Sequence, residues 1–402
     1  MMGTRDAILT INCGSSSVKF ALFTAENEPW RLFKGAVARI GLPDGQLRFE
    51  DSGSATLVDE IVIARDHERS LMLVLETVGR HAKGLNLVGV GHRVVHGGPD
   101  CDCPLAINAP LLARLDRLVP LAPLHLPHNL AGIAAVRRAR PDLPQFACFD
   151  TAFHQNLPRL ARLTALPRAL EQEEIRRYGF HGLSYEYVLD ELRRRDGEQK
   201  AGERLVVAHL GNGASMAAIR GGRSVETTMG FSTLGGLPMG TRSGDLDPGI
   251  ILYLLTEKGM TVEGVVRLLY EESGLLGLSG ISSNMQDLLV RTDDPAATEA
   301  VEFFCYQARK HLGSLAAALG GLDRIVFTGG IGANAPSVRA KICENLEHLS
   351  IALDETRNQR GNGAISAARS RVRVEAFPTD EELMIARHVR GLLAAHPVAR
   401  EA

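Results

Sequence analysis

The stretch Ala7–Phe23 reads AILTINCGSSSVKFALF and places a turn of small polar residues between two apolar runs. The stretch Leu205–Ile219, LVVAHLGNGASMAAI, repeats this design in the second half of the chain. Glycine accepts positive φ and brings no Cβ, so the backbone N–H groups of such a turn can converge on an anion. Two copies indicate two related halves that close on one polyphosphate. A phosphotransferase is therefore the first hypothesis.

The composition is that of a soluble globular enzyme. The 402 residues suffice for two domains, and 45% of them are hydrophobic, 23% are charged, and the formal net charge is −2. No apolar run approaches the ~18 residues of a membrane span. The six cysteines include no CxxC pair, which argues against a disulfide framework or a zinc knuckle. We therefore expect a cytoplasmic protein that binds neither nucleic acid nor membrane.

The apolar pattern predicts strands first and then helix–strand alternation in each half. Strands are expected at about 7–11, 18–23, 31–38, 46–50, 58–63, 87–91, 145–149, 205–219 (as a hairpin), 324–328 and 372–376. Helices are expected at about 68–83, 129–139, 248–258, 261–271, 294–320, 336–347 and after Pro378. This order suggests α/β domains in which helices cover a central sheet. No linker marks the boundary, which we place near residue 150.

Two short motifs favour other chemistries only weakly. Residues 16–19, SSVK, fit the serine acyl-enzyme pattern S-x-x-K, but Lys19 lies in a strand-like run and no KTG follows. Residues 330–335, GIGANA, match the dinucleotide pattern G-x-G-x-x-A, with Asp354 about twenty residues further on. They come too late in the chain for a complete dinucleotide domain. A mononucleotide at the same turn and helix start explains them as well.

The densest polar segment is MGTRSGDLDPG, residues 239–249. Asp245 and Asp247 can be explained as caps of the helix that follows Pro248. Arg242, flanked by glycine and serine, suits a mobile phosphoryl group better than core packing. Four histidines in two pairs suggest a zinc site: His92 with His96, and His125 with His128. Nothing in the sequence places the two pairs together, and histidines beside proline are commonly structural.

In order along the chain, these segments resemble the acetate kinase (acetokinase) family. The matching stretches are TINCGSSSVKF, GHRVVHGG, LAPLH, FDTAFH, RYGFHG, HLGNGAS, MGTRSGDLDPG, FTGGIGAN and PTDEELMIAR. The resemblance implies two duplicated domains of the actin, Hsp70 and sugar-kinase (ribonuclease H-like) class around a nucleotide cleft. Residues 1–150 would form the acyl-substrate domain, 151–379 the nucleotide-binding domain, and a C-terminal helix at 380–402 would pack on the first. The family also implies a homodimer.

The implied reaction is the reversible phosphorylation of acetate by ATP to give acetyl phosphate and ADP, by direct in-line transfer with Mg²⁺, or Mn²⁺ in its place. A carboxylate must approach a γ-phosphate that is also negative, so cations must offset the repulsion. Acetate is already ionised at neutral pH and needs no strong base. A propionate or other short-chain carboxylate kinase is the nearest alternative. A non-catalytic nucleotide-binding protein of the same fold is the second.

The resemblance assigns the chemical roles residue by residue. Arg242 would contact the transferring phosphoryl group, His181 would donate to it, and Asp150 corresponds to the family's catalytic carboxylate. Because no proton leaves the nucleophile, we favour an orienting role for Asp150, on an arginine. Arg93 would bind the acetate carboxylate. The rest of the acyl pocket would comprise Val95, Leu124, His125, Phe180 and Thr233.

The nucleotide and metal positions follow from the same motifs. Asn12 and Glu381 match the magnesium positions, and two protein oxygens suit that ion. Lys19 and the turn formed by His209, Leu210, Gly211, Asn212 and Gly213 would contact the nucleotide phosphates. The nucleoside would meet Asn284, Met285, Gln286, Gly330, Ile331, Gly332, Ala333 and Asn334.

The sequence departs from the family pattern at a few of these positions. Thr233 stands where the family usually has proline, and LHLP at 124–127 replaces LHNP. Asn284 and Gln286 replace the Asp and Arg of a D-M-R segment, and Ala333 replaces a glutamate. We therefore expect a working kinase with altered nucleotide affinity or choice. The preference between acetate and propionate stays open.

Overall fold

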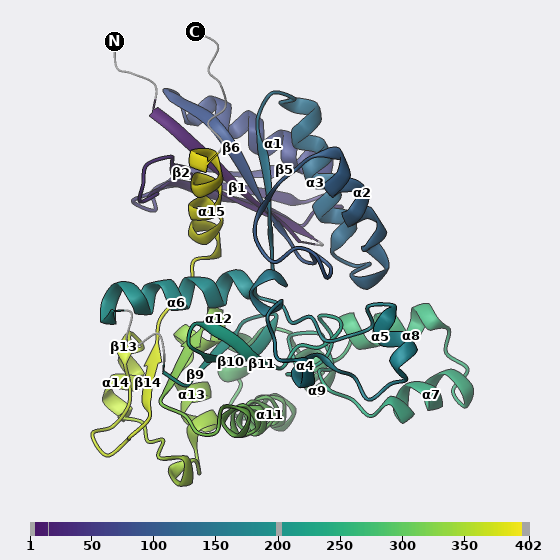
Figure 1. Cartoon of the computed structure of the whole chain (residues 1–402), viewed down its shortest axis with the longest axis vertical. Helices are drawn as coiled ribbons and strands as arrows, with labels where there is room; N and C mark the ends of the chain where they lie inside the picture. The colour runs from purple at the N-terminus through teal and green to yellow at the C-terminus, as the bar shows by residue number, and fades with distance from the viewer. Residues whose placement is uncertain (1–4, 15, 198–202, 396–402) are drawn as a thin grey trace. The chain divides into compact units, whose positions relative to one another are not determined.

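The structure, a computed structural model, describes residues 5–14, 16–197 and 203–395. These residues form two compact units (Figure 1). Unit 1 contains the chain through Gln155 and from Asp380 onward, and unit 2 contains Asn156–Thr379. Ser15 of the first turn, and residues 396–402 of the expected C-terminal helix, lie outside the described residues.

Unit 1 is built on an eight-stranded sheet in the order β5-β4-β3-β2-β1-β6-β8-β7. Each of the strands β1 to β5 runs antiparallel to its neighbour, whereas β6 is parallel to β1 and β8 is parallel to β6. Their bounds are β1 (Arg5–Cys13), β2 (Ser17–Thr24), β3 (Arg31–Ala38), β4 (Gly45–Asp51), β5 (Thr56–Val62), β6 (Leu85–Val94), β7 (Leu105–Ala106) and β8 (Gln145–Phe149).

Helices cover both faces of this sheet. On one face, α1 (His67–His81) and α3 (Leu126–Ala139) pack on the side chains of alternate strand residues such as Leu9 and Ile11. On the other face lies α15 (Glu381–Ala395), and α2 (Ala109–Arg117) packs beside α3. Gly91 of β6 permits a close approach of α15, since a Cβ there would lie 2.3 Å from the Ile385 side chain. The part of α15 around Ile385 and Val389 is thereby packed closely on the sheet.

Unit 2 is built on a six-stranded sheet in the order β11-β10-β9-β12-β14-β13. Its strands are β9 (Leu205–Leu210), β10 (Ala214–Arg220), β11 (Arg223–Thr227), β12 (Arg324–Thr328), β13 (Gly363–Ala364) and β14 (Arg373–Ala376). The long helix α11 (Pro295–Leu319) covers β10 and β11, and α6 (Gly182–Asp196) lies on the other side of the sheet (Figure 1).

Shorter helices complete unit 2. They are α4 (Arg159–Arg162), α5 (Arg168–Gln172), α7 (Pro248–Thr256), α8 (Val262–Glu271), α9 (Gly274–Ser279), α10 (Met285–Leu289), α12 (Gly329–Asn334), α13 (Pro336–Cys343) and α14 (Glu355–Arg360). In the part of the chain that the structure describes, no helix is long and apolar enough to cross a membrane.

The two sheets share one topology. The order β3-β2-β1-β6-β8 in unit 1 corresponds to β11-β10-β9-β12-β14 in unit 2. In both, the first three strands are antiparallel and the next two run parallel to the hairpin's first strand. The doubled hairpin in the sequence therefore marks a doubled fold. The prediction of two duplicated α/β units is confirmed.

Several elements differ from the expected bounds, among them β6, α3 and α12. β6 continues through Val94, beyond the expected end at residue 91, because apolar Val90 and Val94 keep the alternation. α3 begins at Leu126 because proline is accepted in the first helical turn. The GIGAN segment is helical, as α12, rather than an open turn.

Candidate active site

In unit 1 the predicted residues gather at the carboxyl ends of parallel strands, where open α/β sheets bind their ligands. Asn12 and Arg93 lie near the ends of β1 and β6, and Asp150 directly follows β8. Thr10 pairs with Gly91, which faces α15. Because side chains two residues apart share a face, Asn12 and Arg93 lie on the face that α15 covers.

Asp150 holds Arg93 through two nitrogens of the guanidinium. Nε donates at 2.9 Å and Nη2 at 2.6 Å to the two carboxylate oxygens. Asp150 is 1% exposed. Burial disfavours the Arg93 cation, but the charges of Asp150 and then Glu381 outweigh it and raise the pKa of Arg93. The guanidinium is thus a permanent cation in one orientation, and its Nη1 lies 3.6 Å from Glu381.

A second arginine fixes the first turn of α15. Arg31 donates through Nη2 to Asp380 at 2.6 Å and to Glu382 at 3.3 Å. Burial raises the pKa of Glu382, while Arg31 acts in the opposite direction. Asp380 and Glu382 are therefore tied to the sheet on either side of Glu381. The sequence reasoning did not single out Arg31, since an arginine in a strand has no local signature.

Lys19 and Asn12 are directly paired across the β1–β2 hairpin, so their side chains share a face. Asn129 on α3 ties this hairpin to the end of β6. Its amide donates to the Cys13 carbonyl at 3.0 Å and accepts from the N–H of Val95 at 3.0 Å. Asn129 was also missed, because its role appears only when α3 lies across two strands.

The residues predicted for the acyl pocket belong to different units. Val95 is buried, and Leu124 and His125 are half-buried, in unit 1, whereas Phe180 and Thr233 are buried in unit 2.

The other histidines of the first half have local partners. His92 contacts Gln145, and burial lowers the pKa of His92 to about 4. His96 accepts from the Gly98 N–H at 2.9 Å, and His128 stacks on His67 at 4.3 Å. Across the described ranges, no three His, Cys, Asp or Glu side chains are grouped so as to hold a metal ion.

In unit 2, two stacked imidazoles lie beside the second hairpin. The rings of His181 and His209 are 4.3 Å apart. His181 precedes α6 with φ 60°, a left-handed conformation that costs a non-glycine residue energy and recurs at functional sites. His181 Nδ1 lies 2.8 Å from Ser215 Oγ, and His209 Nδ1 lies 2.8 Å from Ser184 Oγ.

The predicted phosphate turn and the Arg242 segment are in contact. The turn closes through a bond from the Gly211 N–H to the Gly213 carbonyl at 3.0 Å. Its Asn212 carbonyl accepts from the Gly240 N–H at 3.1 Å. Arg242 donates through Nη1 to the Thr233 carbonyl at 3.1 Å. His181, the turn and Arg242 therefore belong to one cluster, because a Cβ on Gly213 would lie 3.2 Å from His181 Nε2.

Helix α9 anchors the Arg242 segment from behind. The N–H groups of Ser273, Leu275 and Leu276 donate to the carbonyls of residues 241, 239 and 240. These are N–H groups that the start of a helix leaves without intrahelical partners. Gly274 has φ +62°, and a Cβ there would lie 2.1 Å from the Met239 carbonyl oxygen and 2.7 Å from that of Arg242. The segment can approach α9 this closely only because residue 274 is glycine.

The predicted nucleoside residues line a pocket of about 580 Å³ in unit 2. Its lining includes Gly211, Asn212, Asn284, Met285, Gln286, Gly330, Ile331 and Asn334. Asn284 caps α10 by accepting from the Gln286 N–H at 3.0 Å. Ala333 and Gly332 do not line the pocket: both are buried inside α12, where their carbonyls accept from Arg339. The helical form of this segment, unforeseen in the sequence, turns residue 333 inward.

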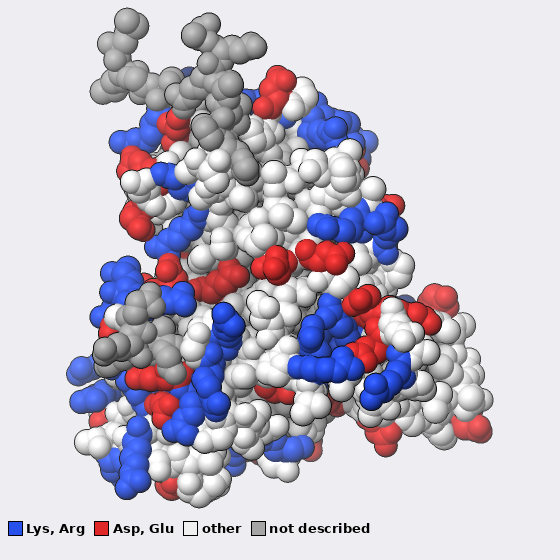
Figure 2. Space-filling model, in the orientation of Figure 1, with Lys and Arg blue, Asp and Glu red and all other residues white. Residues whose placement is uncertain are grey.

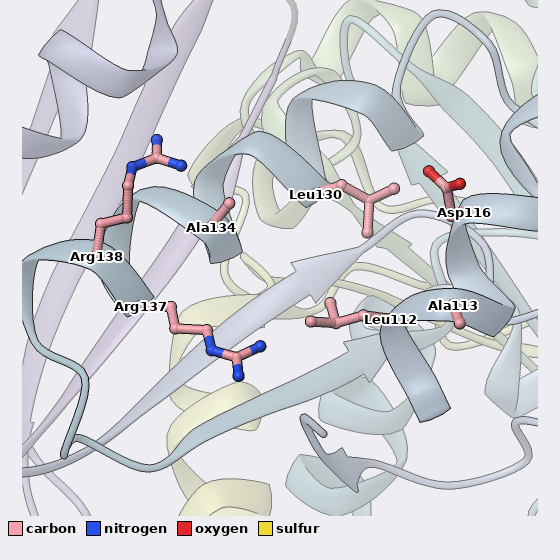
Figure 3. Close-up of a pocket in the computed structure, with 7 residues that line it drawn as sticks. All are labelled: Leu112, Ala113, Asp116, Leu130, Ala134, Arg137 and Arg138. Atoms are coloured by element: carbon pink, nitrogen blue, oxygen red, sulfur yellow. The ribbon is translucent and has the colours of Figure 1, made fainter. Parts of the chain in front are cut away.

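A second hollow, of about 560 Å³, lies on unit 1 between α2 and α3 (Figure 3). Leu112, Ala113, Leu130 and Ala134 give it apolar walls. Arg138 at its edge is paired with Glu68 at 2.8 Å. None of the predicted site residues lines this hollow, so it is not part of the candidate site.

The fold and these two clusters define a phosphotransferase built from two duplicated α/β units. The chain matches the Acetokinase family over residues 7–387 and belongs to that family. It is 48% identical to acetate kinase from Rhodopseudomonas palustris over 389 residues, which are 96% of this chain and 98% of that one.

Solved structures agree with this membership. The crystal structure of Porphyromonas gingivalis acetate kinase superposes with a TM-score of 0.86 at 36% identity, covering 96% of this chain and 100% of that one. A propionate kinase from Francisella tularensis gives a TM-score of 0.89 at 35% identity, covering 95% and 98%. The chain is therefore a kinase of the kind that uses a carboxylate acceptor.

We predict that Gly274→Ala will lower kcat by about 10²-fold, because a displacement of about 1 Å in a positioned group costs that much. The KM of the nucleotide should change less than kcat, since Gly274 faces the carbonyls of Met239 and Arg242, which do not line the nucleoside pocket. Gly280→Ala is the matched control: φ is +64° there, but a Cβ meets nothing within 4 Å. Steady-state kinetics together with thermal unfolding compare the two variants. Equal losses in both would show that only backbone strain matters.

Proposed function

We propose that this chain catalyses the reversible transfer of the γ-phosphoryl group of ATP to acetate, forming acetyl phosphate and ADP. The hold of Asp150 on Arg93 carries this proposal. The buried carboxylate grips the Nε–Nη2 edge of the guanidinium and leaves the Nη1 edge, which makes a longer 3.6 Å contact with Glu381, for an anion of similar shape. Sequence relatives named acetate kinase support acetate as that anion.

Arg93 binds the acceptor carboxylate, and Asp150 orients Arg93. The acceptor is ionised at neutral pH, so no proton must be removed before it attacks. One carboxylate oxygen attacks the γ-phosphorus while the bond between that phosphorus and the β,γ-bridging oxygen breaks. Asp150 therefore needs no role as a base, and its full engagement with Arg93 agrees with an orienting one.

Arg242 neutralises the charge that spreads over the transferring group, and His181 donates a hydrogen bond to that group. Donors fixed before the reaction stabilise a phosphoryl transition state without reorganising during it. Arg242 is fixed by the Thr233 carbonyl and by the contact of its backbone with α9. His181 is fixed by Ser215 and by stacking on His209. Lys19 and the turn at 211–213 bind the remaining phosphates.

Asn12 and Glu381 would hold Mg²⁺. Their donor set fits this ion, because amide and carboxylate oxygens are its ordinary ligands and waters and phosphate oxygens complete its shell. The salt bridges of Arg31 to Asp380 and Glu382 keep the first turn of α15 in place around Glu381. When bound, the ion would offset negative charge on the nucleotide phosphates.

The choice of acceptor and of nucleotide base depends on weak contacts. One methylene in an apolar pocket changes preference by only about 1–3 kcal/mol, so propionate is an alternative acceptor. The nucleoside pocket contains amide and hydroxyl side chains but no ionisable residue. Hydrogen bonds alone therefore select the base, and use of a second purine nucleotide is expected. A purely nucleotide-binding role would not need the fixed cations Arg93 and Arg242.

We also infer that the chain forms a homodimer through α7. This helix has the sequence PGIILYLLT and contributes no buried residue. Ile250, Leu252 and Tyr253 are 44%, 63% and 51% exposed, and the surface over α7 is largely uncharged in Figure 2. Contiguous exposed apolar surface of this kind marks interaction sites.

The six cysteines are free, which supports a cytoplasmic location.

The function is tested by incubating the purified chain with Mg²⁺, ATP and acetate and trapping acyl phosphate with hydroxylamine. Parallel reactions with propionate, butyrate, GTP and pyrophosphate establish both substrates.

We expect Arg242→Ala to abolish turnover while sparing ATP binding, since the substitution removes a cation that stabilises the transition state. Arg194→Ala, which breaks an exposed pair with Glu191, is the control and should keep the parental rate. A near-normal rate for Arg242→Ala would contradict the assignment.

The dimer is tested by sedimentation velocity. The parent chain should sediment as a dimer, and Leu252→Asp should sediment as a monomer because a charge would be buried in the apolar contact. Ile61→Asp introduces the same charge on β5 of unit 1, where the side chain is 79% exposed, and should leave the dimer intact. A monomeric parent chain, or a dimeric Leu252→Asp, would refute this interface.

A further inference from the structure

Tyr185 has no role in the reaction described above, yet its side chain is fully buried close to His181. It lies in the first turn of α6, and its hydroxyl is within hydrogen-bonding distance of Ser215 Oγ, at 2.5 Å. Ser215 Oγ is in turn 2.8 Å from His181 Nδ1. A buried chain of two hydroxyls therefore ends on the ring nitrogen of His181 that faces away from the phosphate turn.

The neighbouring imidazole is held in the same way. His209 stacks on His181, and its Nδ1 meets Ser184 Oγ at 2.8 Å. Ser184 and Tyr185 are consecutive on α6, and Ser215 is paired with His209 across the β9–β10 hairpin. The first turn of α6 and the β9–β10 pair thus place a hydroxyl group next to Nδ1 of each ring.

The direction of the hydrogen bonds determines what His181 can do. A neutral imidazole carries one N–H and one acceptor nitrogen. If Tyr185 donates to Ser215, the hydrogen of Ser215 is directed to Nδ1, and Nε2 of His181 must carry the ring proton. If the order is reversed, Nδ1 carries the proton and Nε2 can only accept.

One observation favours the first order, and a second favours a neutral ring. Nε2 of His181 faces the Gly211–Gly213 turn, where a Cβ on Gly213 would lie 3.2 Å from it. A turn of this kind binds anions, and only an N–H can donate to an anion there. The rings of His181 and His209 stack at 4.3 Å, where two charged imidazoles would repel each other, and this favours neutral rings.

We propose that Tyr185 and Ser215 are positioning residues that keep His181 in the neutral tautomer protonated at Nε2, ready to donate to the transferring phosphoryl group. The proposal rests on the proposed function for the role of that donor. The tautomer itself is a property of the chain without substrate.

The kinetic test uses Tyr185→Phe, which removes the hydroxyl and keeps the ring. We expect kcat to fall about tenfold, the equivalent of one hydrogen bond, with the KM values of acetate and nucleotide within about twofold of the parent. Ser215→Ala should lower kcat further, and the double variant should be no slower than Ser215→Ala, because both act through one chain. Tyr178→Phe is the control: its hydroxyl is also buried but donates to the Glu174 carbonyl, and its kcat should be parental.

The tautomer is read directly by NMR of the chain labelled with ¹⁵N-histidine, in which the signal absent from His181→Gln identifies His181. Two-bond ¹⁵N–¹H correlations should show Nε2 protonated in the parent and a mixture of tautomers in Tyr185→Phe. A parent protonated at Nδ1, additive losses in the double variant, or an equal loss in Tyr178→Phe would overturn the proposal. Absence of kinase activity in the parent would instead overturn the proposed function, while the NMR result would stand.

Discussion

Repulsion between two anions is the constraint that this chain must overcome. A carboxylate and a phosphate approach each other only where positive charge is already in place, and mobile cations would lose much of their effect. The arginine and histidine donors of the two clusters are accordingly held in place by other groups of the chain. Asp150 grips Arg93, α9 and the Thr233 carbonyl hold the Arg242 segment, and Ser215 holds His181.

The duplicated topology explains where these groups are found. In both units the turn of the first hairpin and the carboxyl end of the neighbouring parallel strand lie at the same edge of the sheet. The predicted functional side chains lie at or just after these strand ends. The two units have then diverged in use. Unit 1 places an arginine and a carboxylate at this edge, whereas unit 2 places glycine turns and two imidazoles there. We propose that one fold thereby provides a carboxylate site and a phosphate site.

Much of this could be predicted from the sequence, because its signals are local. The doubled hairpin predicts the doubled sheet, and the run DEEL predicts the start of α15. The tertiary partners could not be predicted, since Asn129, Arg31, Tyr185 and Gly274 act on residues distant in sequence. Ala333 shows the opposite case: its position in a family motif suggested a nucleoside contact, but the helical geometry of α12 buries it.

The need for a guanidinium held in one orientation is tested most directly by the acetate saturation curve of Arg93→Lys at saturating nucleotide. Lysine keeps the charge but cannot grip Asp150 and a substrate carboxylate with two parallel hydrogen bonds each. The expected result is a fall in kcat/KM for acetate of about 10²-fold, with the KM of the nucleotide nearly unchanged. A parental acetate curve would contradict this, because charge alone would then suffice.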